Sequence, residues 1–306
     1  MLQRRSWFWQ LWHLASRNVR LYRRVVWPYV VVDTACLLAA AAIVGSIQGS
    51  KLGLSEVPRN LSMAFLVLSV LSSITHLRTF SAFRVVQAHE FSSGVSGTAT
   101  FLASNLTDLP WVFLSPAIFL AIYYFLIVPR AGFSDLYTVG AMDCWWSSGL
   151  SYAISQSSIP PAHHALVMVV VTLILGALFQ RVSPTIREAR GSFTAALQAC
   201  SFNRWATEAV TIREFKPYFE TGWNLILAIY TDTGMCDMDL HTGYGTVQTA
   251  DPVEQLRRAS RLRTFSAGSC DAYARNALGI LAGSGVVLRL LAYFELRLGA
   301  LAVRKR

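Results

Sequence analysis

The sequence predicts an all-α membrane protein with six transmembrane helices, and three observations carry this prediction. Long apolar runs alternate with short polar or basic breaks, and these runs lie at about 25–48, 61–77, 98–128, 136–156, 164–180 and 277–303. Each run is close to the roughly 17–25 residues that a helix needs to cross a bilayer. Charged residues make up only 14% of the chain, against about 25% in soluble domains. The arginines flank the runs, as they do at the ends of membrane spans.

The first 24 residues predict an amphipathic helix that lies on the membrane surface. Arginines precede and follow a segment that contains Trp7, Phe8, Trp9 and Trp12. Such a segment places its aromatic side chains at the level of the lipid head groups and its charges in water. It lacks the long apolar centre and small-residue cleavage site of a secretory signal. An ordinary juxtamembrane anchor is the alternative interpretation.

Basic residues also predict the orientation of the chain. The first 24 residues contain six arginines and no acidic residue, and the chain ends in Arg304, Lys305 and Arg306. Short segments rich in Lys and Arg stay on the cytoplasmic side. We therefore expect both termini and residues 78–97 to be cytoplasmic. The segments expected outside are 49–60, 129–135 and the long outer segment 182–275, since long loops cross the membrane largely regardless of their charge.

The outer segment 182–275 is the main part of the sequence whose composition resembles that of a soluble protein. Phe193 to Tyr218 predicts one or two helices, residues 231–252 predict a loop rich in Gly, Thr and Asp, and Gln255 to Arg263 predicts a basic helix.

Three of the five cysteines fall in the outer segment: Cys200, Cys236 and Cys270. An oxidising exterior permits a disulfide among them. Cys236 with Cys270 is the first hypothesis, although connectivity does not follow from sequence and the other pairings stay open.

Two apolar runs contain a Gly-x-x-x-Gly spacing, which allows close contact between membrane helices. The spacings are Gly45 to Gly49 in the first run and Gly279 to Gly283 in the last.

Among the ionisable residues in the apolar runs, Asp33, Asp108, Asp143 and Arg289 are expected at membrane depth. Each costs about 2.5–3.5 kcal/mol at the centre of a membrane helix, and an apolar residue offsets only about 0.3–0.6 kcal/mol. We therefore expect these side chains to face the bundle interior, a partner or water. Structural pairing or interface anchoring is the main interpretation, and a direct role in a substrate path is the alternative. Arg289 is expected to snorkel or to pair with an acid, with Asp33 favoured because its depth is similar.

The sequence contains no recognisable catalytic or nucleic-acid-binding motif. The chain has no Gly-x-x-x-x-Gly-Lys-Ser/Thr phosphate loop and no His-Glu-x-x-His zinc motif. Its formal net charge of +10 comes from arginines spread beside the spans rather than from one basic patch. We therefore expect no catalytic residue, no metal and no bound cofactor in this chain, and no nucleic acid among its partners.

Several short segments, taken in order, resemble one family. Val32-Asp33 in the first span, the cytoplasmic His89-Glu90-Phe91-Ser92-Ser93-Gly94 and the outer Arg204-Trp205-Ala206-Thr207-Glu208-Ala209 are similar to motifs of G-subfamily, white–brown type ATP-binding-cassette half-transporters. The resemblance is to their ABC-2-type membrane domain, above all in plant and algal members, and it runs through nearly the whole chain. It identifies residues 1–24 with the family's connecting helix and 25–306 with its six-span domain.

The resemblance implies the membrane half of an ATP-driven exporter of lipid-like or other hydrophobic substrates. Two half-transporters, as a homodimer or a heterodimer, would work by alternating access in the plasma membrane or an organelle membrane. It further implies that Arg84, His89, Glu90 and Gly94 couple the spans to an ATPase domain, which would hold ATP and Mg²⁺.

One departure from the family leaves a second hypothesis open. Family half-transporters carry a nucleotide-binding domain before the spans, and these 306 residues contain none. The ATPase would then be a separate chain or a missing part. The alternative is a membrane subunit or truncated fragment that transports nothing itself.

Overall fold

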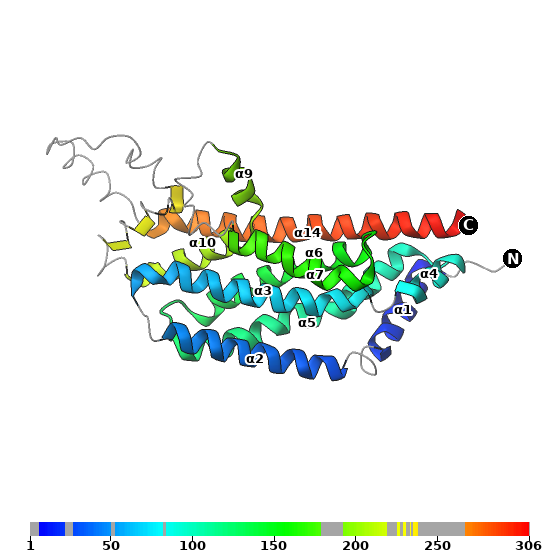
Figure 1. The fold of residues 1–306 in the computed structure, drawn as a ribbon, viewed down its shortest axis with the longest axis horizontal. Helices are drawn as coiled ribbons and strands as arrows, with labels where there is room; N and C mark the ends of the chain where they lie inside the picture. Colours follow the sequence, from blue (N-terminus) through cyan, green and yellow to red (C-terminus); the bar gives the residue numbers. More distant parts are fainter. Residues whose placement is uncertain are drawn as a thin grey trace.

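The computed structural model describes residues 6–21, 27–49, 53–81, 84–178, 192–218, 225–226, 229–230, 233, 235–237 and 267–305. Every regular element within these ranges is helical. The long helices lie side by side along the longest axis of the molecule (Figure 1). Two shorter helices, α1 (Trp7–Leu21) and α4 (Arg84–Ser92), lie at one end of this bundle. The all-α class predicted from the sequence is confirmed.

Five segments within the described residues are long and apolar enough to cross a membrane: Pro28–Gly49, Leu54–Ser81, Gly97–Ile127, Pro161–Leu178 and Cys270–Gly299. They coincide with α2 (Trp27–Gly49), α3 (Val57–Ser81), α5 (Gly97–Ile127), α7 (His164–Leu173, extended by a π-helical turn to Leu178) and α14 (Ala267–Lys305). Five of the six predicted runs thus correspond to apolar helices.

The remaining run corresponds to α6 (Phe133–Gln156), which is more polar than the other long helices. Its 24 residues span about 36 Å at 1.5 Å per residue, enough to cross a ~30 Å hydrocarbon core. α6 packs against α3, α5, α7, α14 and α10 (Phe202–Phe215). Because other helices enclose it, α6 needs no apolar face toward lipid.

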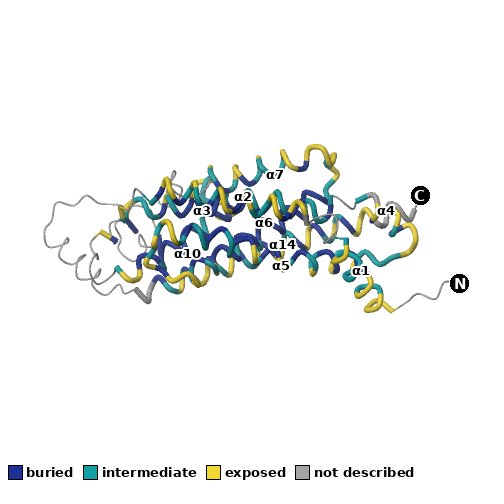
Figure 2. Tube along the Cα trace, turned by 90° about the horizontal axis from the view of Figure 1, so that it is seen from below, coloured by how far each residue is buried: buried dark blue, intermediate teal, exposed yellow. Residues whose placement is uncertain are grey.

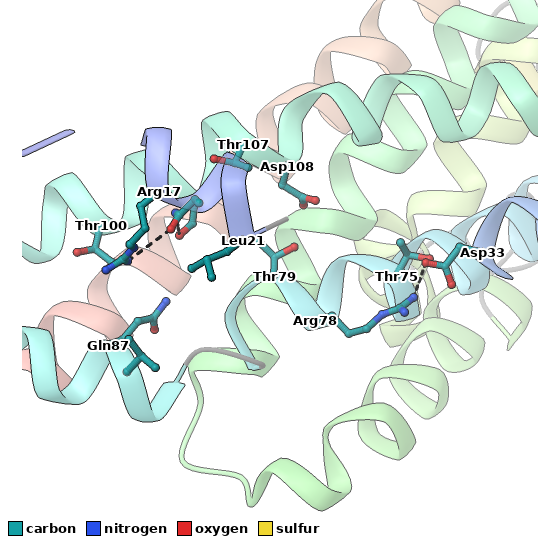
Figure 3. A pocket seen from close by; sticks show the side chains of 13 residues that line it. Arg17, Leu21, Asp33, Thr75, Arg78, Thr79, Gln87, Thr100, Thr107 and Asp108 are labelled. Atoms are coloured by element: carbon teal, nitrogen blue, oxygen red, sulfur yellow. Dashed lines mark hydrogen bonds and ion pairs between the residues drawn. The ribbon is translucent and has the colours of Figure 1, made fainter. Parts of the chain in front are cut away.

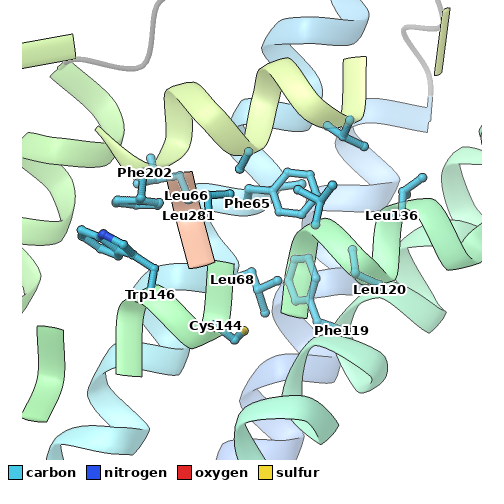
Figure 4. Packing of buried hydrophobic residues seen from close by; sticks show 14 of the residues in the cluster. Phe65, Leu66, Leu68, Phe119, Leu120, Leu136, Cys144, Trp146, Phe202 and Leu281 are labelled. Carbon is cyan, nitrogen blue, oxygen red and sulfur yellow. The ribbon is translucent and has the colours of Figure 1, made fainter. Parts of the chain in front are cut away.

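Buried residues lie along the middle of the bundle (Figure 2). They form an apolar core to which α2, α3, α5, α6, α7, α10 and α14 all contribute (Figure 4). Phe65 of α3 and Phe119 of α5 are almost completely buried there. Trp146 of α6 stacks on Phe202 of α10, with ring centroids 4.4 Å apart. α10 belongs to the outer segment in the sequence, yet its side chains complete the core of the spans.

The part of the outer segment before residue 219 contains two helices, α9 (Phe193–Cys200) and α10. The prediction of one or two helices over Phe193–Tyr218 is therefore confirmed. The carboxylate of Glu214 on α10 accepts the backbone N–H groups of Arg130 and Ala131, at 2.9 and 2.8 Å, in the turn between α5 and α6. Burial raises the pKa of Glu214, although these two donors oppose the shift. The predicted helix Gln255–Arg263 lies outside the described residues.

The last helix begins earlier than the sequence predicts. α14 starts at Ala267 rather than near 277, so the outer segment ends before 275. Its first turns carry Asp271 and Arg275, which hid them from the search for apolar runs. Cys270 and Ala274 on the same turns are buried in a small cluster with Ile212 of α10. This packing holds the start of α14 in a helix.

Glycine sets the distance between α6 and α14, whose contact is the most extensive in the fold. A Cβ atom at Gly285 would lie 2.4 Å from Cδ1 of Trp145, and one at Gly149 would lie 2.9 Å from the carbonyl oxygen of Gly285. Distances this short are not tolerated, so any larger residue would push the helices apart. Of the two predicted contact spacings, Gly45 to Gly49 meets Leu126 of α5, whereas Gly279 and Gly283 face open space.

The substitution Gly285→Ala is expected to lower the stability of the bundle by about 1–3 kcal/mol, the usual cost of overpacking a well-packed contact. Gly283→Ala is the matched control, because it adds the same methyl group two residues away where nothing lies within 4 Å. Thermal unfolding of detergent-purified protein measures both. Equal melting temperatures for the two variants would show that Gly285 does not set the helix spacing.

Candidate functional site

An ion pair joins α1 to α4 at one end of the bundle. Both terminal nitrogens of Arg17 donate to the carboxylate of Glu90, and the longer contact, Nη2 to Oε2, is 3.3 Å. Glu90 is half-buried, with 13% of its side chain exposed. A paired arginine and carboxylate is among the strongest and most directional side-chain contacts.

The same end of the bundle holds α1 against the start of α5. The amide of Asn18 donates to Ser104 Oγ at 3.4 Å, and Gln10 Oε1 accepts the backbone N–H of Ser96 at 3.2 Å. Trp7 Nε1 donates to Thr98 at 3.0 Å. α1 is therefore attached to both α4 and α5, at several points along its length.

The other predicted coupling residues lie around α4 but do not gather into one site. Arg84 at its start donates to the carbonyl oxygens of Ser157 and Ile159, in the turn between α6 and α7, at 3.0 and 3.5 Å. Gly94 follows α4 with a φ of +90°, a conformation that favours glycine and ends the helix. His89 has an exposed side chain.

An aromatic cluster connects α4 to the bundle interior. Phe91 of α4 is 5% exposed and belongs to a buried cluster with Phe80 of α3, Tyr152 of α6 and two residues of α14, Ala292 and Leu296. The rings of Phe80 and Tyr152 meet edge to face with centroids 5.1 Å apart. Sequence reasoning did not single out Phe91, although it is an apolar residue in a short polar helix.

Asp33 pairs with Arg78, so the predicted pair of Asp33 with Arg289 is wrong. Arg78 Nη2 donates to Asp33 Oδ2, and the guanidinium also lies 5.1 Å from the ring centroid of Tyr29. Asp33 is six residues from the start of α2, and Arg78 is three from the end of α3. Because α2 and α3 are antiparallel neighbours, the two side chains lie at a similar depth.

Asp108 forms a fully buried hydrogen-bonded group with two other spans. Its Oδ2 contacts His76 Nδ1 of α3 at 2.6 Å and accepts the hydroxyl of Tyr152 of α6 at 2.5 Å. Asp108 is 2% exposed, and the other two side chains are 0% exposed. The sequence analysis named Asp108 but missed His76. A histidine inside an apolar span was the available signal for it.

Arg289 of α14 is held by α6 rather than by an acid. Nη1 donates to the backbone oxygen of Trp145 at 2.6 Å, and Nη2 donates to Ser148 Oγ at 2.6 Å. The guanidinium lies 3.4 Å from the ring centroid of Trp145 and 5.3 Å from that of Tyr152. Tyr152 thus lies between Arg289 and Asp108, and it connects the two charged residues through one side chain.

Asp143 stands apart from the other three ionisable residues. It is 0% exposed at the centre of α6, and Ser69 of α3 is its hydroxyl neighbour. Neither of its carboxylate oxygens has a hydrogen-bond partner within the described part of the chain. An unpaired buried carboxylate is costly in this setting, and nothing in the geometry brings it to a ligand.

A disulfide joins Cys236 to Cys270 at the end of the bundle opposite α1. It ties the outer segment to the first turns of α14. The backbone N–H of Cys236 donates to Glu208 of α10 at 3.3 Å, which places the disulfide beside that helix. Cys200 is a free, exposed thiol.

Comparison with known protein families agrees with this geometry. The model of the family described as ABC-2 type transporter matches residues 11–231, from α1 through α10. This match covers more than half of the chain.

The curated relatives are plant proteins of low identity. White-brown complex homolog protein 30 of Arabidopsis thaliana is 27% identical over 192 residues, which cover 61% of this chain and 16% of the relative. ABC transporter G family member 25 of Oryza sativa subsp. japonica is 27% identical over 190 residues, 61% of this chain and 18% of the relative. The chain thus spans less than a fifth of the length of these relatives. From the family match over 11–231, the chain belongs to the ABC-2 type transporter family.

Proposed function

We propose that this chain is the transmembrane half of an ATP-driven exporter that moves lipid-like or other hydrophobic molecules. Its membership of the ABC-2 type transporter family makes it an integral membrane subunit of an ABC transporter. The name of its relative in Oryza places that protein in the ABC transporter G family. Such a subunit would work with an ABC-type ATPase domain and a second half-transporter, either an identical copy or a different chain.

One observation carries this proposal, namely that α4 is attached on three sides. Glu90 binds Arg17 of α1, Arg84 binds the turn between α6 and α7, and Phe91 enters the aromatic cluster. A helix held in this way moves as a unit with its neighbours. Force applied to α1 or α4 by an ATPase domain would therefore reach α3, α6 and α14 directly.

The aromatic cluster gives that force a route into the spans. Phe91 and Tyr152 share the cluster, and the hydroxyl of Tyr152 is bonded to Asp108. A shift of α4 would be passed to Tyr152 and, through its hydroxyl, to Asp108 of α5. Buried polar contacts have few intermediate arrangements, so such a shift favours a change between two states, as alternating access requires.

Energy would come from ATP and Mg²⁺ bound by a nucleotide-binding domain outside these 306 residues. No phosphate loop occurs among them, and the proposed role of this chain is to convert the motion of that domain into a change of the bundle. The end with α1 and α4 would then face the cytoplasm, in the plasma membrane or an organelle membrane.

The substitution Glu90→Ala is expected to uncouple ATP turnover from export in the transporter assembled with its ATPase domain. Loss of the pair with Arg17 removes charged hydrogen bonds, so export per ATP should fall about tenfold, corresponding to about 1.4 kcal/mol. Transport and ATP hydrolysis measured together in reconstituted vesicles give this ratio.

Two further variants separate coupling from a general loss of structure. The charge exchange Arg17→Glu with Glu90→Arg should restore part of the coupling that either change alone removes. Glu56→Ala, which removes an exposed ion pair with Arg59 at the other end of α3, should change nothing. Unchanged coupling in Glu90→Ala would reject the role of α4, and absence of any associated ATPase would favour a subunit that does not transport.

The two ends of the bundle are expected to react from opposite sides of the membrane. A membrane-impermeant maleimide should label the exposed Cys200 on intact cells, whereas a cysteine placed at Ser92 on α4 should react only after permeabilisation. Cys200→Ser provides the control for labelling elsewhere. Labelling of both positions from the same side would contradict the proposed orientation.

A further inference from the structure

A cavity of about 260 Å³ lies between α1, α2, α3, α4 and α5 (Figure 3), at the end of the bundle where α1 and α4 lie, here called the coupling end. It is partly open, and none of its lining residues comes from α6, α7, α10 or α14. It therefore lies to one side of the aromatic cluster and of the contact between α6 and α14. Two of its lining residues, Arg17 and Asp108, also belong to the proposed coupling route.

The depth of the cavity matches the boundary between lipid head groups and acyl chains. Thr79 is two residues from the end of α3, and Asp108 is eleven residues from the start of α5. At 1.5 Å per residue these positions lie about 3 and 16 Å inside the ends of their helices. A molecule in the cavity would therefore have its polar end near the membrane surface and its apolar end in the hydrocarbon region.

The exposed wall of the cavity is mostly apolar even though several threonines line it. The hydroxyls of Thr75, Thr100 and Thr107 each donate to a carbonyl one turn earlier in their own helix, at 3.0, 3.1 and 2.8 Å. These hydroxyls need no partner from a ligand. The wall thus suits an apolar chain or ring rather than a polar metabolite.

The charged residues around the cavity already have partners within the protein. Arg17 and Arg78 line it together with Asp33 and Asp108. Arg17 is already paired with Glu90, and Arg78 with Asp33. An anionic head group would approach two carboxylates, and a cationic one would approach two arginines. An uncharged head group meets neither repulsion.

Two side chains in the lining remain available for hydrogen bonds. Gln87 of α4 is only 5% exposed, and in the described residues neither its amide nor the hydroxyl of Thr79 has a hydrogen-bond partner. The amide atoms of Gln87 are not fully buried, so they can reach a molecule in the cavity. A ligand hydroxyl could both accept from and donate to this amide.

We propose that this cavity binds the hydroxyl-bearing head of an uncharged lipid, with Gln87 and Thr79 as its hydrogen-bonding partners and the apolar wall around the first part of its chain or ring. Diacylglycerols and sterols share this chemistry. The bound lipid would touch α1 and α4 on one side and α3 and α5 on the other, and would stabilise their packing. This binding requires neither ATP nor a second half-transporter, so its failure would leave the exporter proposal untouched.

The test uses the purified full chain in lipid nanodiscs and a photoreactive diacylglycerol. Three unlabelled lipids compete with the probe: a diacylglycerol, cholesterol, and a phosphatidic acid with the same acyl chains as the diacylglycerol. The diacylglycerol or cholesterol should suppress labelling of α3, α4 and α5 peptides at a concentration about tenfold below that of phosphatidic acid, a difference of about 1.4 kcal/mol. The better of the two neutral competitors identifies the source of the lipid.

Variants of the lining give the second arm of the experiment. Thr107→Trp should fill the cavity and abolish labelling, whereas Leu114→Trp, two turns along α5 at a site 51% exposed, should leave it intact. Should Thr107→Trp fail to fold, the near-isosteric Gln87→Leu and Thr79→Val keep the test decisive, since each should weaken binding about fivefold by removing one hydrogen bond. Equal or better competition by phosphatidic acid, or labelling that none of these lining variants reduces, would overturn the proposal.

Discussion

The close contact between α6 and α14 is the constraint on which the rest of the bundle depends. A bilayer offers no water to a buried charge, so Arg289 must find its partners within the protein. It finds them on α6, in the carbonyl of Trp145 and the hydroxyl of Ser148. This is possible because Gly149 and Gly285 leave no Cβ atom between the two helices. Without that approach, the guanidinium could not lie 3.4 Å from the ring centroid of Trp145.

The position of α6 explains its composition. Its serines donate to neighbouring carbonyls and hydroxyls: Ser151 bonds to the backbone of Ser73 at 2.8 Å, and Ser147 to Ser72 at 3.2 Å, both on α3. Small hydroxyl residues of this kind allow close packing and cross-helix bonds in membrane bundles. A helix facing lipid could not carry so many of them. The polar character of α6 is therefore a consequence of its enclosure by the other long helices.

Length and hydropathy were sufficient to predict the helices but not the partners of their charges. The apolar runs located every long helix, because the thickness of a bilayer constrains the number of apolar residues directly. Depth alone suggested that Asp33 meets Arg289. The depth of a residue in the membrane does not fix the direction in which its side chain leaves the helix axis. In the structure Asp33 binds Arg78 instead. The second apolar run ends at 77 and so predicts a loop position for Arg78, whereas α3 continues to Ser81.

The start of α14 and the buried His76 were missed for related reasons. Asp271 and Arg275 interrupt the apolar pattern, although Cys270 and Ala274 on the same turns are buried against α10. A window average cannot detect a helix that is half polar and packed against protein rather than lipid. The search for costly residues in the spans considered only aspartate and arginine, which are charged in water near pH 7, and therefore left out His76. Its role follows only from the 2.6 Å contact with Asp108.

Tyr152 connects the aromatic cluster at the coupling end to the buried polar residues farther inside the bundle. Its ring packs with Phe80 in the cluster that contains Phe91, and its hydroxyl donates to Asp108. The ring also lies 5.3 Å from Arg289. One rigid aromatic side chain therefore shares a cluster with Phe91 of α4, is bonded to the buried acid of α5 and lies beside the buried base of α14. A displacement of α4 large enough to move Tyr152 must either break its bond to Asp108 or carry α5 with it. Because an unpaired carboxylate is costly in this interior, moving the helices together is the lower-energy response.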